Sequence, residues 1–405
     1  MRLIKYLTLV IFFCVLVSNR TNAKILWERE LVPDANTNSA PLASCLNKDG
    51  NGIIVTTVES PRGSLPVKGD NILWEIGTDG NAIRILPRNT DGTKVYTKPD
   101  PVGYGCAIAS DSLGDLLTIG ILEKQKEEKG QKIAVIPKTN KAEKIMSIRN
   151  SIESHSIKKM IPLQDNTFFL VGDQNSNGLC MRIDIQGRIM QEKLFNIGQT
   201  DIFSSVDQIK SNANLVIAGL SANLSRKDYH ENSAESFILI YDPNLNLVHE
   251  DHFANENSVS MFSLLLPKVC CLDNGNIAVL YKKENADPNK TLLWTRCYTK
   301  ELKLLWDKEV FVADKQPFAM DITSRNSGGF IIGIVRHIIQ QSGGLELCSF
   351  DDEGDKVDQI KYQGLVGIVG FNLMNVKDRT IVVFDWGTEG NIKECSIKAK
   401  VIALD

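Results

Sequence analysis

Short apolar runs recur along the chain, each directly after a turn rich in Asp, Asn and Gly. "NKDGNGIIV", "LDNGNIAV" and "RNSGGFII" show the pattern, and a spacing of roughly fifty-five residues that drifts along the chain is typical of a repeat array with variable loops. Asp, Asn and Gly supply the backbone conformations that tight hairpin turns need. The first large apolar residues of these runs are Ile53, Leu116, Phe168, Leu215, Ile277, Phe330 and Ile381.

A second hairpin follows most of these runs across a polar loop. The hairpins cover 71–86, 132–148, 179–195, 237–253, 292–311 and 345–362. Aligning them on their turns brings five residues to one position: Trp74, Met181, Leu239, Trp294 and Cys348. Such mixed occupancy indicates a packing position rather than a ligand platform. Helical periodicity appears nowhere for any length. Four antiparallel strands per repeat predict an all-β protein, a seven-bladed β-propeller.

The last repeat is incomplete, because "ECSIKAKVIALD" supplies a third strand and no fourth strand follows it. The segment "ILWEREL" at 25–31 aligns with "LLWDKEV" at 304–310, which is the fourth strand of an earlier repeat. The alignment places Trp27 on Trp306. We therefore expect one propeller domain over 24–405, closed by an N-terminal strand at 25–32 that pairs with the last blade, 366–405.

The first 23 residues have the features of a secretory signal peptide. Arg2 and Lys5 precede a short apolar run, and a polar stretch leads to Ala23, where cleavage is expected. The protein is therefore expected to be exported, and to be periplasmic, secreted or located at the cell surface. Lipid anchoring at Cys14 is an alternative, although Ile-Phe-Phe precedes this cysteine where a lipoprotein signal has a small residue.

Composition and charge exclude several classes of partner. The formal net charge is −3, with Lys and Arg scattered along the chain, so neither a nucleic acid nor a polybasic membrane contact is expected. No segment after the N-terminal run is apolar for long enough to cross a membrane. Eight of the cysteines follow residue 23, and most lie inside apolar strand runs. Two alternatives therefore remain: some of these cysteines form disulfides, or their thiols stay free and act as small hydrophobic residues.

The repeats resemble those of secreted bacterial β-propellers of the delta-60, PQQ-like and WD40-like types. The residues that carry the resemblance are Asp49-Gly50-Asn51, Asp79-Gly80-Asn81, Asp273-Asn274-Gly275-Asn276 and the aligned tryptophans. The resemblance covers the chain after residue 23. It implies the propeller fold, and it implies no particular activity, because propellers serve many functions.

No motif predicts catalysis, a cofactor or a metal. The chain has no Gly-x-Ser-x-Gly nucleophile motif and no phosphate-binding Gly loop. His249 and His252 resemble a metal pair, but their odd separation on a strand points them to opposite faces. The adjacent Cys270 and Cys271 resemble the vicinal disulfide of some quinoprotein dehydrogenases, yet on a strand they are expected to be two separate buried thiols.

The remaining candidate is a binding face formed by loops around the propeller axis. Five residues at strand ends entering these loops combine aromatic, cationic and acidic character: Tyr104, Arg336, His337, Asp385 and Trp386. Loops on a rigid frame commonly carry binding function. The sequence therefore favours an exported, non-catalytic propeller that binds a protein or a glycan through this face. The alternative is a propeller enzyme, either a carbohydrate hydrolase or lyase or a quinoprotein-like oxidoreductase.

Overall fold

The computed structural model describes most of the chain between residues 25 and 404. The described residues are 25–31, 37–61, 70–85, 107–111, 114, 116–121, 131–136, 144–147, 155–223, 233–257, 265–283, 287, 290–313, 317, 319–336, 344–363, 365–377, 379–387 and 397–404. These residues form β-strands joined by turns.

The strands are β1 (Ile25–Leu31), β2 (Thr37–Leu46), β3 (Gly52–Pro61), β4 (Asp70–Gly77), β5 (Ala82–Ile85), β6 (Ala107–Ser110), β7 (Leu116–Ile121), β8 (Gln131–Ile136), β9 (Lys144–Ser147), β10 (His155–Pro162), β11 (Thr167–Gln174), β12 (Asn177–Asp184), β13 (Ile189–Phe195), β14 (Thr200–Gln208), β15 (Leu215–Asn223), β16 (Ser233–Tyr241), β17 (Leu247–Asn257), β18 (Lys268–Cys271), β19 (Ile277–Lys283), β20 (Thr291–Tyr298), β21 (Leu304–Ala313), β22 (Ala319–Ser324), β23 (Phe330–Arg336), β24 (Gly344–Phe350), β25 (Lys356–Gln363), β26 (Leu365–Val376), β27 (Arg379–Gly387) and β28 (Ile397–Leu404).

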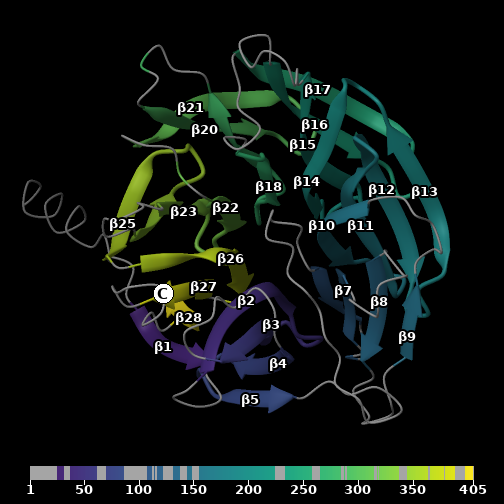
Figure 1. Ribbon diagram of the computed structural model, residues 1–405. Helices are drawn as coiled ribbons and strands as arrows, with labels where there is room; N and C mark the ends of the chain where they lie inside the picture. Colours follow the sequence, from purple (N-terminus) through teal and green to yellow (C-terminus); the bar gives the residue numbers. More distant parts are fainter. Residues whose placement is uncertain are drawn as a thin grey trace, which may run out of the picture.

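The strands form four-stranded antiparallel sheets arranged as the blades of a propeller (Figure 1). Six blades are continuous stretches of chain, from β2–β5 through β22–β25, and their strands pair in sequence order. The prediction of seven blades is therefore wrong: the structure has six blades of consecutive strands. The remaining four-stranded sheet is a composite of both ends of the chain, in the order β1-β28-β27-β26.

The composite sheet joins β1 to the C-terminal strands, as Figure 1 shows for purple β1 beside yellow β28. Arg29 pairs with Val401 and Leu31 with Ala399. Leu31 is fully buried, whereas Ile25 is 39% exposed, so the end of β1, rather than its start, anchors the strand in the core. Lys398 also forms an ion pair with Glu30 at 2.7 Å.

The alignment of Trp27 with Trp306 has a structural reason. Each ring packs on a positive-φ glycine in the turn of the following blade: Trp27 on Gly80 and Trp306 on Gly354. Trp27 Nε1 donates a hydrogen bond to Thr78 O at 2.7 Å, and Trp306 Nε1 donates one to Asp352 O at 3.2 Å. The residue two places further along each strand also donates to the same turn, from Arg29 Nε to Gly80 O and from Lys308 Nζ to Glu353 O. The same contact, a Trp ring packed on a turn glycine, thus joins the outer strands β1 and β21 to the next blade.

Replacing Gly354 by Ala tests this contact. An added Cβ would lie 2.7 Å from Trp306 Cη2, and φ is +79°, so the variant combines a steric clash with backbone strain. Gly50→Ala is the matched control, because φ is +61° there and no atom lies within 4 Å of the added Cβ. We expect Gly50→Ala to cost about 1–2 kcal/mol from the backbone alone, and Gly354→Ala to cost clearly more in urea unfolding. Equal costs would show that the Trp306 contact adds no stability.

The hydrophobic core lies between neighbouring blades rather than inside any single one. One cluster combines Leu293 and Phe311 with Phe330 and Phe350, and another combines Leu31 with Trp74. At the aligned packing position, Trp74, Met181, Leu239 and Cys348 are buried and Trp294 is partly buried. The prediction of a packing position is confirmed.

Side chains also link the innermost strands of successive blades. In the part of the chain that the structure describes, these strands are the inner edges of their sheets, so their outward backbone N–H groups need other acceptors. Asp207 on β14 accepts a hydrogen bond from Cys271 N on β18 at 2.8 Å. Asp321 on β22 likewise accepts one from Leu373 N on β26 at 2.8 Å. Where the ends of the ring meet, Ser39 Oγ on β2 accepts a hydrogen bond from Ala399 N on β28 at 3.0 Å and donates one to Leu31 O on β1 at 2.6 Å.

Candidate functional site

The predicted face residues fall in different parts of the molecule. Tyr104 and His337 lie outside the described residues. Asp385 and Trp386 lie near the end of β27, where their backbones pair with Ala399 and Lys398 of β28. Arg336 is the last residue of β23 in the neighbouring blade, and it is the one predicted residue that lines a described cavity.

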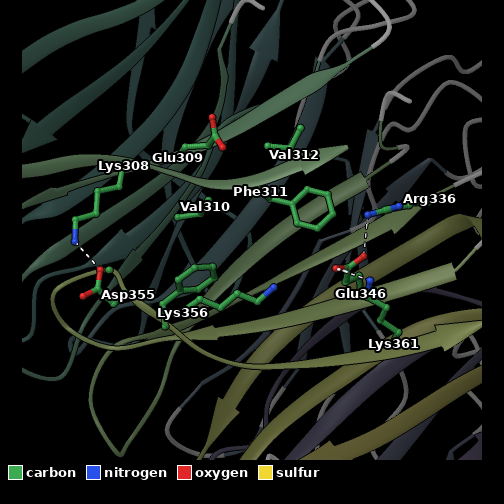
Figure 2. A pocket seen from close by; sticks show the side chains of 12 residues that line it. Lys308, Glu309, Val310, Phe311, Val312, Arg336, Glu346, Asp355, Lys356 and Lys361 are labelled. Carbon is green, nitrogen blue, oxygen red and sulfur yellow. Dashed lines mark hydrogen bonds and ion pairs between the residues drawn. The ribbon is translucent and has the colours of Figure 1, made fainter. Parts of the chain in front are cut away.

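This cavity is a groove of about 510 Å³ between the β18–β21 and β22–β25 blades (Figure 2). One wall is the stretch of β21 from Lys308 to Val312. The other wall contains Arg336 and residues of the next hairpin: Glu346, Phe350, Gly354, Asp355, Lys356 and Lys361. The groove therefore follows the junction of two outer strands, β21 and β25.

An irregularity in β21 builds the apolar floor of the groove. Leu293 pairs with Phe311 and the next residue, Trp294, pairs with Glu309, so Val310 is an extra residue in β21. Such a bulge breaks the alternation of side chains. As a result, the consecutive residues Val310 and Phe311 are both buried, at 8% and 7% exposure. They line the groove together with Phe350.

Arg336 lies across this floor. Its guanidinium carbon is 4.9 Å from the centre of the Phe311 ring, in the geometry of a cation–π contact. Its Nη2 donates a hydrogen bond to Glu346 Oε2 at 2.8 Å. Its Nε is buried and has no hydrogen-bond partner among the described residues, as is also true of Arg296 Nε at the preceding junction between blades. The side chain remains 35% exposed, so a donor of this guanidinium is left for another acceptor.

Positive charge exceeds negative charge at this end of the groove. Glu346 is buried and serves both Arg336 and Lys361, whose Nζ is 3.6 Å from Glu346 Oε1. Lys356 extends toward the same group in Figure 2, and its Nζ donates to the neutral Gln359 at 2.7 Å. Arg336 and Lys361 thus share one carboxylate, and Lys356 adds a third positive charge nearby. At the other end, Lys308 is neutralised by Asp355 at 2.9 Å.

The junction between the β14–β17 and β18–β21 blades has a similar arginine, but acidic side chains surround it on both sides. Arg296 lies 4.6 Å from the Phe253 ring, as Arg336 does from Phe311. There, however, Asp251 and Asp307 both bind the guanidinium at 3.0 Å, and the Arg296 side chain is only 16% exposed. Arg296 therefore holds two blades together, whereas Arg336 has one carboxylate and an open groove beside it.

The histidine pair on β17 confirms the expected opposite orientations. His252 packs against Phe237 of its own blade and contacts Glu235 and Glu250 at 3.1 and 2.6 Å. Burial lowers the pKa of His252, but these two carboxylates outweigh burial and the net pKa is raised. His249 instead contacts Tyr298 of the next blade. Among the residues with described side chains, no cluster of three His, Cys, Asp or Glu could hold a metal ion.

Cys270 and Cys271 are free thiols and both are buried. Burial raises the pKa of each thiol well above the usual range, so neither is a reactive thiolate. The expectation of two separate buried thiols agrees with this arrangement. Over the described part of the chain, no helix has the length and apolar character that a membrane crossing requires.

Comparison with known proteins places the chain by fold. No protein-family model matches the sequence, and no curated protein matches it. The solved structure of the polysaccharide lyase Uly1 is similar over 90% of this chain and 89% of its own, with a TM-score of 0.51 and 10% identity. Drosophila Plexin A in complex with Semaphorin 1b matches over 95% and 87%, at 7% identity and a TM-score of 0.45. One of two analysed prolyl endopeptidases matches over 86% and 47%, at 10% identity and a TM-score of 0.46. At these identities the likeness to Uly1 shows the fold alone, and that fold is a β-propeller.

Proposed function

We propose that this protein is an exported, non-catalytic propeller that binds a protein partner in the groove between β21 and β25. The observation that carries the proposal is the Arg336 guanidinium, which lies on the apolar floor, is 35% exposed beside the groove, and is bound by the buried carboxylate of Glu346. The exposed N–H groups of this guanidinium can donate to a carboxylate of a ligand, and such charge-assisted hydrogen bonds are strong. The matching partner segment carries an acidic side chain.

The shape of the groove supports a short extended segment as the ligand. Five consecutive residues of β21, an outer strand, line one wall. Extended segments bind along such strands and gain specificity from side-chain pockets. The bulge at Val310 interrupts regular strand pairing, so side chains rather than a long hydrogen-bond ladder would provide the affinity. An apolar residue beside the acidic one would cover Phe311.

A random-peptide display library tests the proposal, because it selects ligands by their chemistry alone. We expect the wild-type protein to enrich peptides with Asp or Glu next to an apolar residue. The double variant Arg336→Gln, Lys356→Gln removes two cations that face the ligand, and we expect at least about tenfold weaker binding, equivalent to about 1.4 kcal/mol. Circular dichroism would verify that the variant is folded.

Lys300→Gln is the matched control, because Lys300 lies outside the groove, is 59% exposed and forms an ion pair with its neighbour Glu301. Binding by this control should equal that of the wild type. If the enriched peptides bound the double variant as tightly as the wild type, the groove would not be the binding site. If the library gave acidic peptides no advantage, the assignment of an acidic ligand would be wrong.

A further inference from the structure

The outer strands share an irregularity close to their first residue. In β1, β13, β17, β21 and β25, the pairing with the neighbouring strand shifts by one residue just after the strand begins. Each shift leaves one extra residue in the outer strand. These extra residues are Leu26, Met190, Val248, Leu305 and Val357, and all of them are apolar.

Most of these extra side chains face solvent. The exposed fractions of Leu26, Met190, Val248 and Leu305 lie between 39% and 54%, and Val357 is partly buried. A bulge interrupts the alternation of side chains, so the extra residue does not have to pack against a neighbouring blade. The residues just before three of the bulges, Ile25, Leu247 and Leu304, are apolar and exposed as well.

Protection of strand edges does not account for this composition. Bulges, together with charged side chains, keep an outer strand from pairing with another chain. Apolar residues work against that purpose, yet they occupy the same position in five sheets. These sheets follow one another around the ring, from β10–β13 to the composite sheet (Figure 1). Exposed apolar residues that recur in this way indicate a contact surface.

The extra residues lie at one rim of the propeller, which we call the apolar rim. Successive strands of a blade run in opposite directions, so the turns of its two hairpins lie at the same end. Asn274 Nδ2, in a first hairpin, donates a hydrogen bond at 2.9 Å to Asp352 Oδ1, in the second hairpin of the next blade. The outer strands begin at these turns, and the extra residues are within their first two positions. A flat surface could therefore contact several of them together.

The N-terminal segment joins the domain at this rim. Ile25 pairs with Leu404, and Trp27 Nε1 donates to Thr78 O in a hairpin turn of the first blade. The mostly apolar run at 7–17 comes shortly before Ile25 in the sequence. A chain that this run leads into a membrane has the apolar rim as the nearest part of its folded domain. The position of β1 therefore favours lipid as the surface that the rim contacts.

The charges beside the rim are largely paired. Arg188 binds Asp184 at 2.6 Å, Lys210 binds Asp273 at 2.9 Å, and Lys308 binds Asp355 at 2.9 Å. Such pairs give the rim no excess of positive charge to attract anionic lipids. A contact with lipid would therefore depend on the apolar side chains.

We propose that the apolar rim holds the protein on the surface of a lipid bilayer, with its side chains among the headgroups and the first acyl carbons. The extra residues do not line the groove between β21 and β25, so a docked protein could still bind its partner there. This proposal rests on the export that belongs to the proposed function. Loss of peptide binding by the groove would leave it unaffected, because the two surfaces are tested with different ligands.

Vesicles of uncharged phosphatidylcholine are the probe for the test. The sample is the protein recovered after export, with its N-terminus identified by mass spectrometry. We expect the wild type to float with these vesicles in high salt, because apolar contacts are not screened. We expect Val248→Ser, Leu305→Ser to bind about tenfold more weakly, because two apolar side chains leave the contact.

Leu194→Ser, Ile197→Ser is the matched control. Leu194 and Ile197 are 46% and 39% exposed, but they lie at and just beyond the other end of β13. This control should bind like the wild type. Failure of the wild type to float, binding that requires anionic lipid and disappears in high salt, or equal loss in both variants would overturn the proposal.

A fluorescent amino acid reports the contact directly, even if the apolar run is retained or a serine variant does not fold. In place of Leu305, we expect its emission to shift to shorter wavelength on vesicles and to be quenched by brominated lipid. In place of Leu194, we expect neither change. The same response at both positions, or none at 305, would contradict the proposal. So would a wild type that sediments as a dimer without lipid while Val248→Ser, Leu305→Ser is a monomer, because the rim would then join two copies.

Discussion

Deletion of residues 25–31 is expected to lower the free energy of unfolding by about 3–5 kcal/mol. The deletion removes Leu31 from the core between the first and last blades, and it removes the Trp27 contact with Gly80. It also leaves β28 with an unpaired edge, which favours association with other chains. Since whole domains are typically stable by about 5–15 kcal/mol, we expect a much lower melting temperature and aggregation in light scattering.

A crosslink across the same seam provides the complementary measurement. Glu30 pairs with Lys400 in the antiparallel register of β1 and β28. Cysteines at these two positions should form a disulfide that raises the melting temperature under oxidising conditions. Ile25→Ala is the control for the deletion, because Ile25 is 39% exposed and its truncation should have little effect. An unchanged melting temperature after the deletion would contradict the closure of the ring by β1.

Phe330→Ala is expected to cost about 3–5 kcal/mol, because the truncation of a buried Phe leaves a cavity. Phe330 is fully buried at the start of β23. Its ring stacks on Phe350 with centroids 5.0 Å apart and lies 6.1 Å from Trp306 of the preceding blade. The side chain thus joins two blades directly beneath the groove. Urea unfolding monitored by tryptophan fluorescence would measure the loss.

Ile83→Ala is the matched control on an outer strand. Ile83 is 63% exposed, so its truncation should change stability by less than about 0.5 kcal/mol. A loss below about 1 kcal/mol for Phe330→Ala would contradict the account in which interfaces between blades carry the stability of the ring.

The repeat pattern predicted most of the fold. Turns followed by apolar runs located the second strand of each blade, and the alignment of Trp27 with Trp306 located the strand that closes the ring. The structure explains this alignment, because both rings pack on a glycine of the next blade. The predicted blade number was wrong because each apolar run was counted as one blade. Such a run marks a second strand in the six continuous blades and also in the composite sheet, so the count could not tell them apart.

The groove could be predicted only in part. Arg336 was singled out as a cationic residue at a strand end that enters a loop of the expected binding face, but its neighbours could not be identified. Phe311 faces the groove because Val310 is an extra residue in β21, and no pattern in the sequence announces this bulge. Glu346 and Lys361 join Arg336 through strand register, which depends on the whole blade.

Hydrogen–deuterium exchange of the wild-type protein, with and without a saturating acidic peptide selected from the library, tests the central claim most directly. The account predicts that slower exchange is concentrated in β21 and in the hairpin of β24 and β25, and that the variant Arg336→Gln, Lys356→Gln loses this protection at the same peptide concentration. Protection confined to other blades, or protection of the groove strands that persists in full in the variant, would contradict the claim that the groove between β21 and β25 is the binding site.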